Sequence, residues 1–124
     1  MAQMIVIYKT PKNPAAFDRH YFEFHAPLAR QLPRLRKYET SRGPIISLYG
    51  AVEAHFVSTL HFDSLSDINS AFMSECGRAC AADRQQLVPH ANDVQMFLFD
   101  TLTMNGTDEF HAPGRFYGTT GKTS

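Results

Sequence analysis

The sequence lacks the features that would point to nucleic acid, a metal or a nucleotide as its partner. Its 124 residues carry 12 basic and 12 acidic side chains, so the formal net charge at pH 7 is zero. A phosphate backbone requires a basic surplus, which argues against nucleic acid as the main partner. The chain also has no Gly-rich phosphate loop, no Cys/His metal array and no Gly-x-Ser-x-Gly elbow. We therefore expect no metal and no cofactor, although a single histidine could still ligate haem.

Long apolar runs and paired cysteines are also scarce. No stretch approaches the ~20 apolar residues that cross a bilayer, and the start of the chain lacks the basic and apolar regions of a secretory signal. We expect a cytoplasmic protein without membrane contact. The two cysteines, Cys76 and Cys80, stand four residues apart, near the upper limit of disulfide reach on a helix. They are expected to be reduced and half-buried, with a redox switch as the alternative.

The pattern of apolar residues predicts the element order β–α–β–β–α–β. Alternation is clearest in the third strand, where Phe56, Ser58, Leu60 and Phe62 share one face. Asn13 and Ser64 are good N-caps for the two helices, and the first helix is expected to end before Pro33. The predicted strands are 4–9, 35–41, 55–62 and 94–99, and the predicted helices are 14–32 and 65–87, the second interrupted at 74–77.

This order is that of a ferredoxin-like α+β fold, an antiparallel sheet with two helices on one face. The first and fourth strands are apolar on both faces, but two helices cover only one. We expect a second copy of the chain to cover the other face, giving a homodimeric α/β barrel with an apolar cavity between sheet and helices. Residues 1–100 form this domain. Residues 101–124, with scattered aromatics, form either a mobile tail or a dimer arm.

One histidine stands where it could do chemistry. Pro27 cannot donate an N–H and disfavours helical geometry in the residue before it, so we expect His25 on or just past the last regular helical turn. There the helix dipole favours a cation and the imidazole can titrate near neutral pH. His25 is a candidate acid or base at the cavity, and a helix-end histidine bonded to a backbone carbonyl is the alternative. His20, five residues earlier, is expected on a different helix face.

Several phrases of the chain resemble the EthD family from about residue 4 to residue 100. They are Tyr21-Phe22-Glu23-Phe24-His25-Ala26-Pro27-Leu28, Leu32-Pro33-Arg34-Leu35-Arg36-Lys37-Tyr38, Phe62-Asp63-Ser64 and Ala81-Ala82-Asp83. The resemblance implies a dimeric α/β barrel of ferredoxin-like subunits. Relatives by fold include muconolactone isomerases, cofactor-independent monooxygenases and haem-binding enzymes, so the fold alone selects no reaction.

Two positions depart from the family pattern. The family usually has glycine where this chain has Arg34. It often has an aromatic and another acidic residue after the aspartate of the second helix, where this chain reads Arg84-Gln85-Gln86-Leu87. The second departure weakens any role carried over to that region.

Further candidate site residues accompany His25. Asp83 matches a family position and could orient a histidine or substrate, or it could be a surface carboxylate. His61 and Thr59 share a strand face and would reach a substrate if that face lined the cavity; otherwise His61 is a surface histidine. Apolar walls with a hydroxyl donor could come from three tyrosines, of which Tyr21 could equally be core: Tyr8, Tyr21 and Tyr38.

These features favour a small cofactor-free enzyme. His25 would transfer a proton on a hydrophobic oxygenated metabolite of a catabolic pathway, in a reaction of the isomerase or lyase type. The alternative is a non-catalytic protein that binds and shields an intermediate for a neighbouring oxygenase. A third reading is a structural role, in which the dimer face and the arm dock another protein.

Overall fold

The sheet and helices follow the predicted ferredoxin-like order in the computed structural model, which describes residues 1–50 and 53–105. The strands are β1 (Ala2–Tyr8), β2 (Lys37–Thr40), β3 (Phe56–Phe62) and β4 (Val94–Asp100). They pair antiparallel in the order β2-β3-β1-β4. The helical elements are α1 (Pro14–His20), η1 (Tyr21–His25), α2 (Ala26–Ala29), α3 (Leu65–Met73), α4 (Glu75–Leu87) and the short η2 (Ala91–Asp93).

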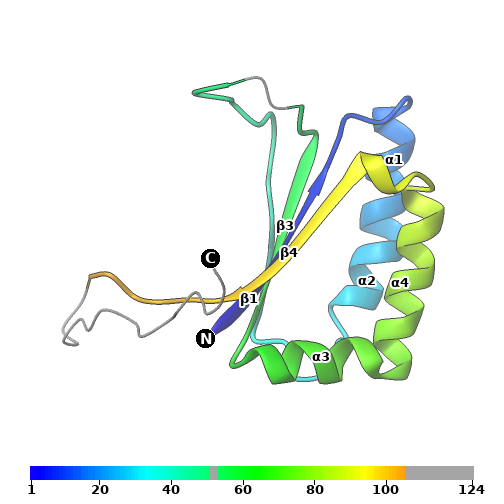
Figure 1. The fold of residues 1–124 in the computed structure, drawn as a ribbon. Helices are drawn as coiled ribbons and strands as arrows, with labels where there is room; N and C mark the ends of the chain where they lie inside the picture. The colour runs from blue at the N-terminus through cyan, green and yellow to red at the C-terminus, as the bar shows by residue number, and fades with distance from the viewer. Residues whose placement is uncertain (51–52, 106–124) are drawn as a thin grey trace.

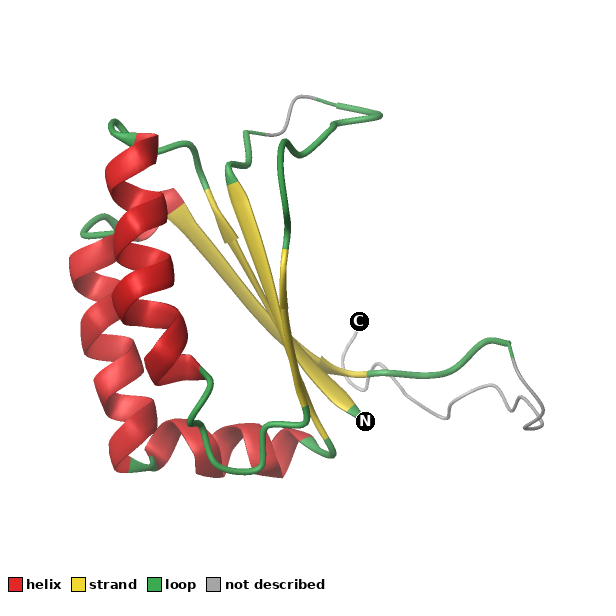
Figure 2. Ribbon diagram, turned by 180° about the vertical axis from the view of Figure 1, so that it is seen from behind, coloured by secondary structure: helices red, strands yellow, loops and turns green. Residues whose placement is uncertain are grey.

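All the long helices lie on one side of the sheet. The first helix and α4 run along this face, and α3 crosses beneath them near one end of the sheet (Figures 1 and 2). No helix in residues 1–50 or 53–105 is long and apolar enough to cross a membrane. Most of the predicted arm, residues 106–124, lies outside the described residues.

The two faces of the sheet differ because side chains alternate along each strand. On the helix face, β1 and β3 bury every second residue, including Tyr8 and Phe62. On the other face, β1 residue Ile5 lies opposite Thr59 of β3 and Phe97 of β4. Phe97 is 49% exposed and Phe99 is 39% exposed, so nothing in residues 1–50 or 53–105 covers the apolar side chains of this face.

The first helix does not end near His25, where Pro27 led us to expect its last regular turn. It runs without a break from α1 through η1 into α2, and Ala26, the residue before the proline, keeps helical angles of φ −59° and ψ −42°. The reason is the π-helical turn η1, in which the Ala26 N–H reaches the carbonyl of Tyr21, five residues back. The extra residue in this turn accommodates a proline that has no N–H to give. His25 therefore lies inside the helix and not at its end.

The predicted caps form as expected. Asn13 accepts a hydrogen bond from the Ala16 N–H, and Ser64 accepts one from the Asp67 N–H, in each case through the side chain. The interruption predicted at 74–77 is shorter than expected, because Ser74 alone separates α3 from α4 and caps the latter.

The residue that departs from the family glycine adopts a backbone conformation that favours glycine. Arg34 has φ +67°, in the left-handed region that costs an L-residue roughly 1–2 kcal/mol. Its side chain pairs with Asp67, with a separation of 2.7 Å between Nη1 and Oδ1. The ion pair offsets part of this strain.

Candidate functional site

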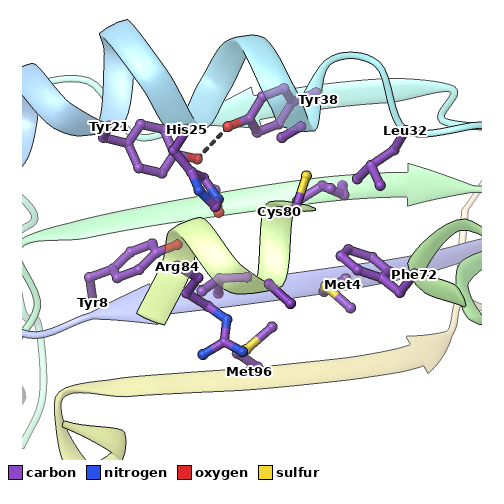
Figure 3. Close-up of a pocket in the computed structure, with 15 residues that line it drawn as sticks. Met4, Tyr8, Tyr21, His25, Leu32, Tyr38, Phe72, Cys80, Arg84 and Met96 are labelled. Carbon is purple, nitrogen blue, oxygen red and sulfur yellow. Dashed lines mark hydrogen bonds between the residues drawn. The ribbon is translucent and has the colours of Figure 1, made fainter. Parts of the chain in front are cut away.

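A cavity of about 90 Å³ lies between the helices and the sheet. Its walls are mainly apolar side chains from β1, β3, the first helix and α4, with Met96 of β4 at one side (Figure 3). Polar groups enter from a few positions only. They are the side chains of Tyr8, Tyr21, His25, Tyr38, Ser58, Cys80 and Arg84.

One carboxylate binds two histidines at the edge of this cavity. The two side-chain oxygens of Asp83 each lie 2.9 Å from a ring nitrogen, one from His20 Nε2 and the other from His25 Nδ1. His25 lines the cavity and is only 8% exposed, whereas the His20 side chain is 29% exposed. The sequence placed the two histidines on different helix faces, and this expectation was wrong. The π-turn between them brings residues five apart to the same side.

The surroundings of His25 keep its imidazole neutral and orient it. Burial lowers the pKa of His25, and this effect outweighs the opposing influence of Asp83; the neighbouring His20 and Arg84 act in the same direction as burial. In the neutral ring, Nδ1–H donates to the Asp83 carboxylate. Nε2 is left unprotonated, and it has no hydrogen-bond partner in residues 1–50 and 53–105. The arrangement is that of a base held by a carboxylate.

The three predicted tyrosines all line the cavity. The hydroxyl groups of Tyr21 and Tyr38 are hydrogen-bonded to each other (Figure 3). Burial is the main cause that raises the pKa of each of the three phenols, so all three remain protonated. The hydroxyl of Tyr8, a residue with only 1% exposure, makes no hydrogen bond within the described residues.

His61 and Thr59 do not lie in this cavity. Their strand, β3, turns Ser58 and Leu60 toward the helices, so the residues between them point to the opposite face of the sheet. His61 Nε2 lies 3.1 Å from Glu39 Oε1 on that face. The sequence made their role conditional on the face that lines the cavity, and the structure places them on the other one.

Three polar residues of the cavity wall were not among the predicted site residues. Ser58 and Cys80 are buried, and burial followed by the neighbouring Cys76 raises the pKa of the Cys80 thiol to about 12. Both cysteines are free, as expected, and the thiolate form of Cys80 is suppressed. Arg84 is the third. The sequence could have indicated Arg84 as a cavity residue, because Arg84 follows Cys80 and Ala81 at helical spacing on the sheet-facing side of α4.

Metal binding finds no support in the described part of the chain, where no group of three or more His, Cys, Asp or Glu side chains could hold an ion. Nε2 of His20 and Nδ1 of His25 both point toward the Asp83 carboxylate and are hydrogen-bonded to it.

Known proteins resemble this chain in sequence and in fold. An uncharacterized 11.0 kDa protein in the thcB-thcC intergenic region of Rhodococcus erythropolis is 34% identical over 110 residues, covering 88% of this chain and 95% of that protein. The crystal structure of an ethyl tert-butyl ether d (EthD) family protein from Bacillus halodurans superposes with a TM-score of 0.74 at 25% identity, covering 82% of this chain and 99% of the other.

More distant structures share the fold alone. SnoaB, a cofactor-independent oxygenase from Streptomyces nogalater, superposes with a TM-score of 0.58 at 12% identity, covering 85% of this chain and 97% of SnoaB. The family model for the EthD domain matches residues 9–91, which include both histidines, Asp83 and most of the cavity wall. This match and the Rhodococcus relative establish that the chain belongs to the EthD family.

Proposed function

We propose that the protein is a cofactor-free enzyme in which His25 transfers a proton on a small hydrophobic oxygenated molecule. The observation that carries the proposal is the neutral imidazole of His25, oriented by Asp83 at the wall of an apolar cavity. A base of this kind requires a pKa near or below the working pH and a fixed tautomer. Burial supplies the first and the carboxylate supplies the second.

An isomerisation illustrates the chemistry that this arrangement supports. In a β,γ-unsaturated lactone, Nε2 of His25 would take a proton from the carbon next to the carbonyl, leaving a dienolate. The imidazolium, stabilised by Asp83, would return a proton to the far end of the conjugated system. No electrons are gained or lost overall, so the step requires no oxidant or cofactor. Catalysis by a positioned acid or base is typically worth 10²–10⁴-fold.

We also propose that the protein is a homodimer. The sheet face that carries Ile5, Phe97 and Phe99 exposes these apolar side chains, and exposed apolar surface of this kind marks interaction sites. A second copy packed face to face would cover both sheets at once. We expect light scattering to give twice the chain mass, and Phe97→Ser to shift the protein toward the monomer.

Turnover of α-angelica lactone, a small β,γ-unsaturated lactone, tests the catalytic proposal. Proton NMR in D₂O follows both isomerisation and uptake of solvent deuterium at the carbon next to the carbonyl. We expect His25→Gln to reduce the rate at least 100-fold, with Asp83→Asn also reduced. His90→Gln is the matched control, because His90 is exposed and lies outside the cavity wall. A His25→Gln variant that is folded and retains the wild-type rate would refute the mechanism.

A binding and shielding role for a neighbouring oxygenase is the second candidate, favoured by the largely apolar cavity wall. It predicts a small molecule that co-purifies with the protein, visible by native mass spectrometry, without turnover of the lactone. A wild-type protein that binds such molecules but exchanges no deuterium would favour this role over catalysis.

A further inference from the structure

Arg84 lies on a side of α4 that otherwise carries small side chains in this chain. On α4, the residues that turn toward the sheet include Gly77 and Cys80, both buried, and Ala81. Arg84 comes one turn later on the same side and lines the same cavity, where Figure 3 shows its side chain extending toward Met96 of β4. A guanidinium group in an apolar wall loses part of its hydration, which is unfavourable unless an anion or polar group compensates for it.

The described part of the chain supplies no such partner. Arg34 and Arg36 pair with Asp67 and Asp63, but Arg84 makes no ion pair in residues 1–50 or 53–105. The adjacent Asp83 directs both of its oxygens to the two histidines instead. Arg84 is also the one formally charged side chain in the cavity wall, because His25 is neutral and no carboxylate contributes to the lining.

Tyr8 adds a second unsatisfied group to the same wall. Its ring is held by edge contacts with Phe17 and Tyr21, and its hydroxyl is buried without a hydrogen-bond partner in the described residues. Burial has the largest effect on the pKa of Tyr8 and on that of His25, and the charge of Arg84 lowers both pKa values. The three groups therefore share one environment. A buried hydroxyl without a partner is rare in native proteins unless water or a ligand satisfies it.

We propose that the cavity takes a small aliphatic carboxylate, whose charged group is bound by the Arg84 guanidinium and the Tyr8 hydroxyl while its carbon skeleton packs against the apolar wall. Both donors suit a carboxylate, since guanidinium and hydroxyl can each donate to one of its oxygens. The size follows from the cavity, because about 90 Å³ is less than the ~150 Å³ that accommodates benzene. An acid of about four or five carbons, whose alkyl part has fewer carbons than benzene, is the largest ligand expected there.

The inference deepens the proposed function by naming its substrate class, and it concerns binding rather than proton transfer. Arg84 lies in the stretch after Asp83 where the sequence departs from the family pattern, so the preference would be a property of this chain. A carboxylate held at Arg84 would also place its carbon chain beside His25, which lines the same cavity.

A matched pair of probes tests the charge preference directly. Isovalerate and isovaleramide have nearly the same shape, but only the first is an anion at pH 7.5. Titration followed by ¹H–¹⁵N NMR gives the dissociation constant of each. We expect wild-type protein to bind isovalerate at least 10-fold more tightly than the amide, and Arg84→Gln to bring this ratio to about one. Tyr8→Phe should reduce the ratio by a smaller factor.

Two controls separate this inference from the catalytic proposal. Arg30→Gln removes an exposed arginine outside the cavity and should keep the wild-type ratio. His25→Gln should lose lactone turnover but keep the preference for the acid, so failure of one proposal does not imply failure of the other. Equal binding of acid and amide by wild type, no binding of either probe, or an unchanged ratio in a folded Arg84→Gln variant would overturn the inference.

Discussion

The neutral state of His25 makes the stability of the protein depend on pH in a defined window. Burial lowers the pKa of His25 in the folded protein below its ordinary value of 6.5. In the unfolded chain the imidazole is exposed and takes up a proton as the pH falls through about 6.5. The unfolded state then binds more protons than the folded state, so the free energy of unfolding falls with decreasing pH.

The size of this effect has an upper limit set by the uptake of one proton. Between about pH 7.5 and about pH 5.5, a histidine that titrates only in the unfolded state removes about 1.4 kcal/mol of stability. The chosen window avoids the carboxylates of Glu39 and Asp63, whose pKa values are lowered in the folded protein by His61 and Arg36 respectively. Their stabilising contributions are present above the ordinary carboxylate range and are lost only at more acidic pH.

Urea denaturation of wild type and His25→Gln at both pH values measures the difference. The chain has no tryptophan, so unfolding is best followed by far-UV circular dichroism, at one protein concentration because a dimer would unfold in a concentration-dependent way. We expect the wild-type free energy of unfolding to fall by up to about 1.4 kcal/mol more than that of the variant. Equal pH dependence, or a His25 resonance that titrates at or above pH 6.5 in the folded protein, would refute the argument.

Two further predictions concern backbone positions that the structure makes sensitive. Helix propensity alone would make Gly77→Ala stabilising by about 1 kcal/mol, but the added Cβ would lie 2.2 Å from the backbone oxygen of Ala71. We expect a net loss of about 1–3 kcal/mol in urea denaturation, and a variant as stable as wild type would contradict the close packing of α3 on α4. Arg34→Gly and Arg34→Ala both remove the exposed ion pair with Asp67, but only glycine relieves φ +67°. The free energy of unfolding of the glycine variant should therefore be about 1 kcal/mol higher than that of the alanine variant. Equal stability of the two variants would argue against the left-handed conformation.

The strands and caps were predictable because local chemistry decides them. Alternation in β3 set which residues face the helices, and the structure buries Phe56, Ser58, Leu60 and Phe62 as that pattern predicts. Asn13 and Ser64 cap their helices because their side-chain oxygens satisfy N–H groups that have no helical partner. The face of β3 that lines the cavity was not predictable, because it depends on the side of the sheet on which the helices pack.

The geometry around His25 could not be read from a regular helical period. At about 100° per residue, side chains five apart differ by about 140°, which separates His20 from His25. The structure removes this separation with a single π-turn, η1, placed directly before Pro27. A proline at this position therefore has two possible outcomes, a helix end or a widened turn, and only the second lets the helix continue to Ala29.

The π-turn η1 links Pro27 to the orientation of His25, the proposed base. A π-turn gives up regular α-helical hydrogen bonding, and such turns are frequently found at functional sites. In this chain it brings His20 and His25 to the two oxygens of one carboxylate, so Asp83 is fixed from both sides and cannot rotate toward Arg84 without breaking a hydrogen bond. The same constraint that orients the imidazole thus leaves the guanidinium without an internal partner. His20 thus helps to hold Asp83 in place, and Asp83 in turn orients the ring of His25, the proposed base.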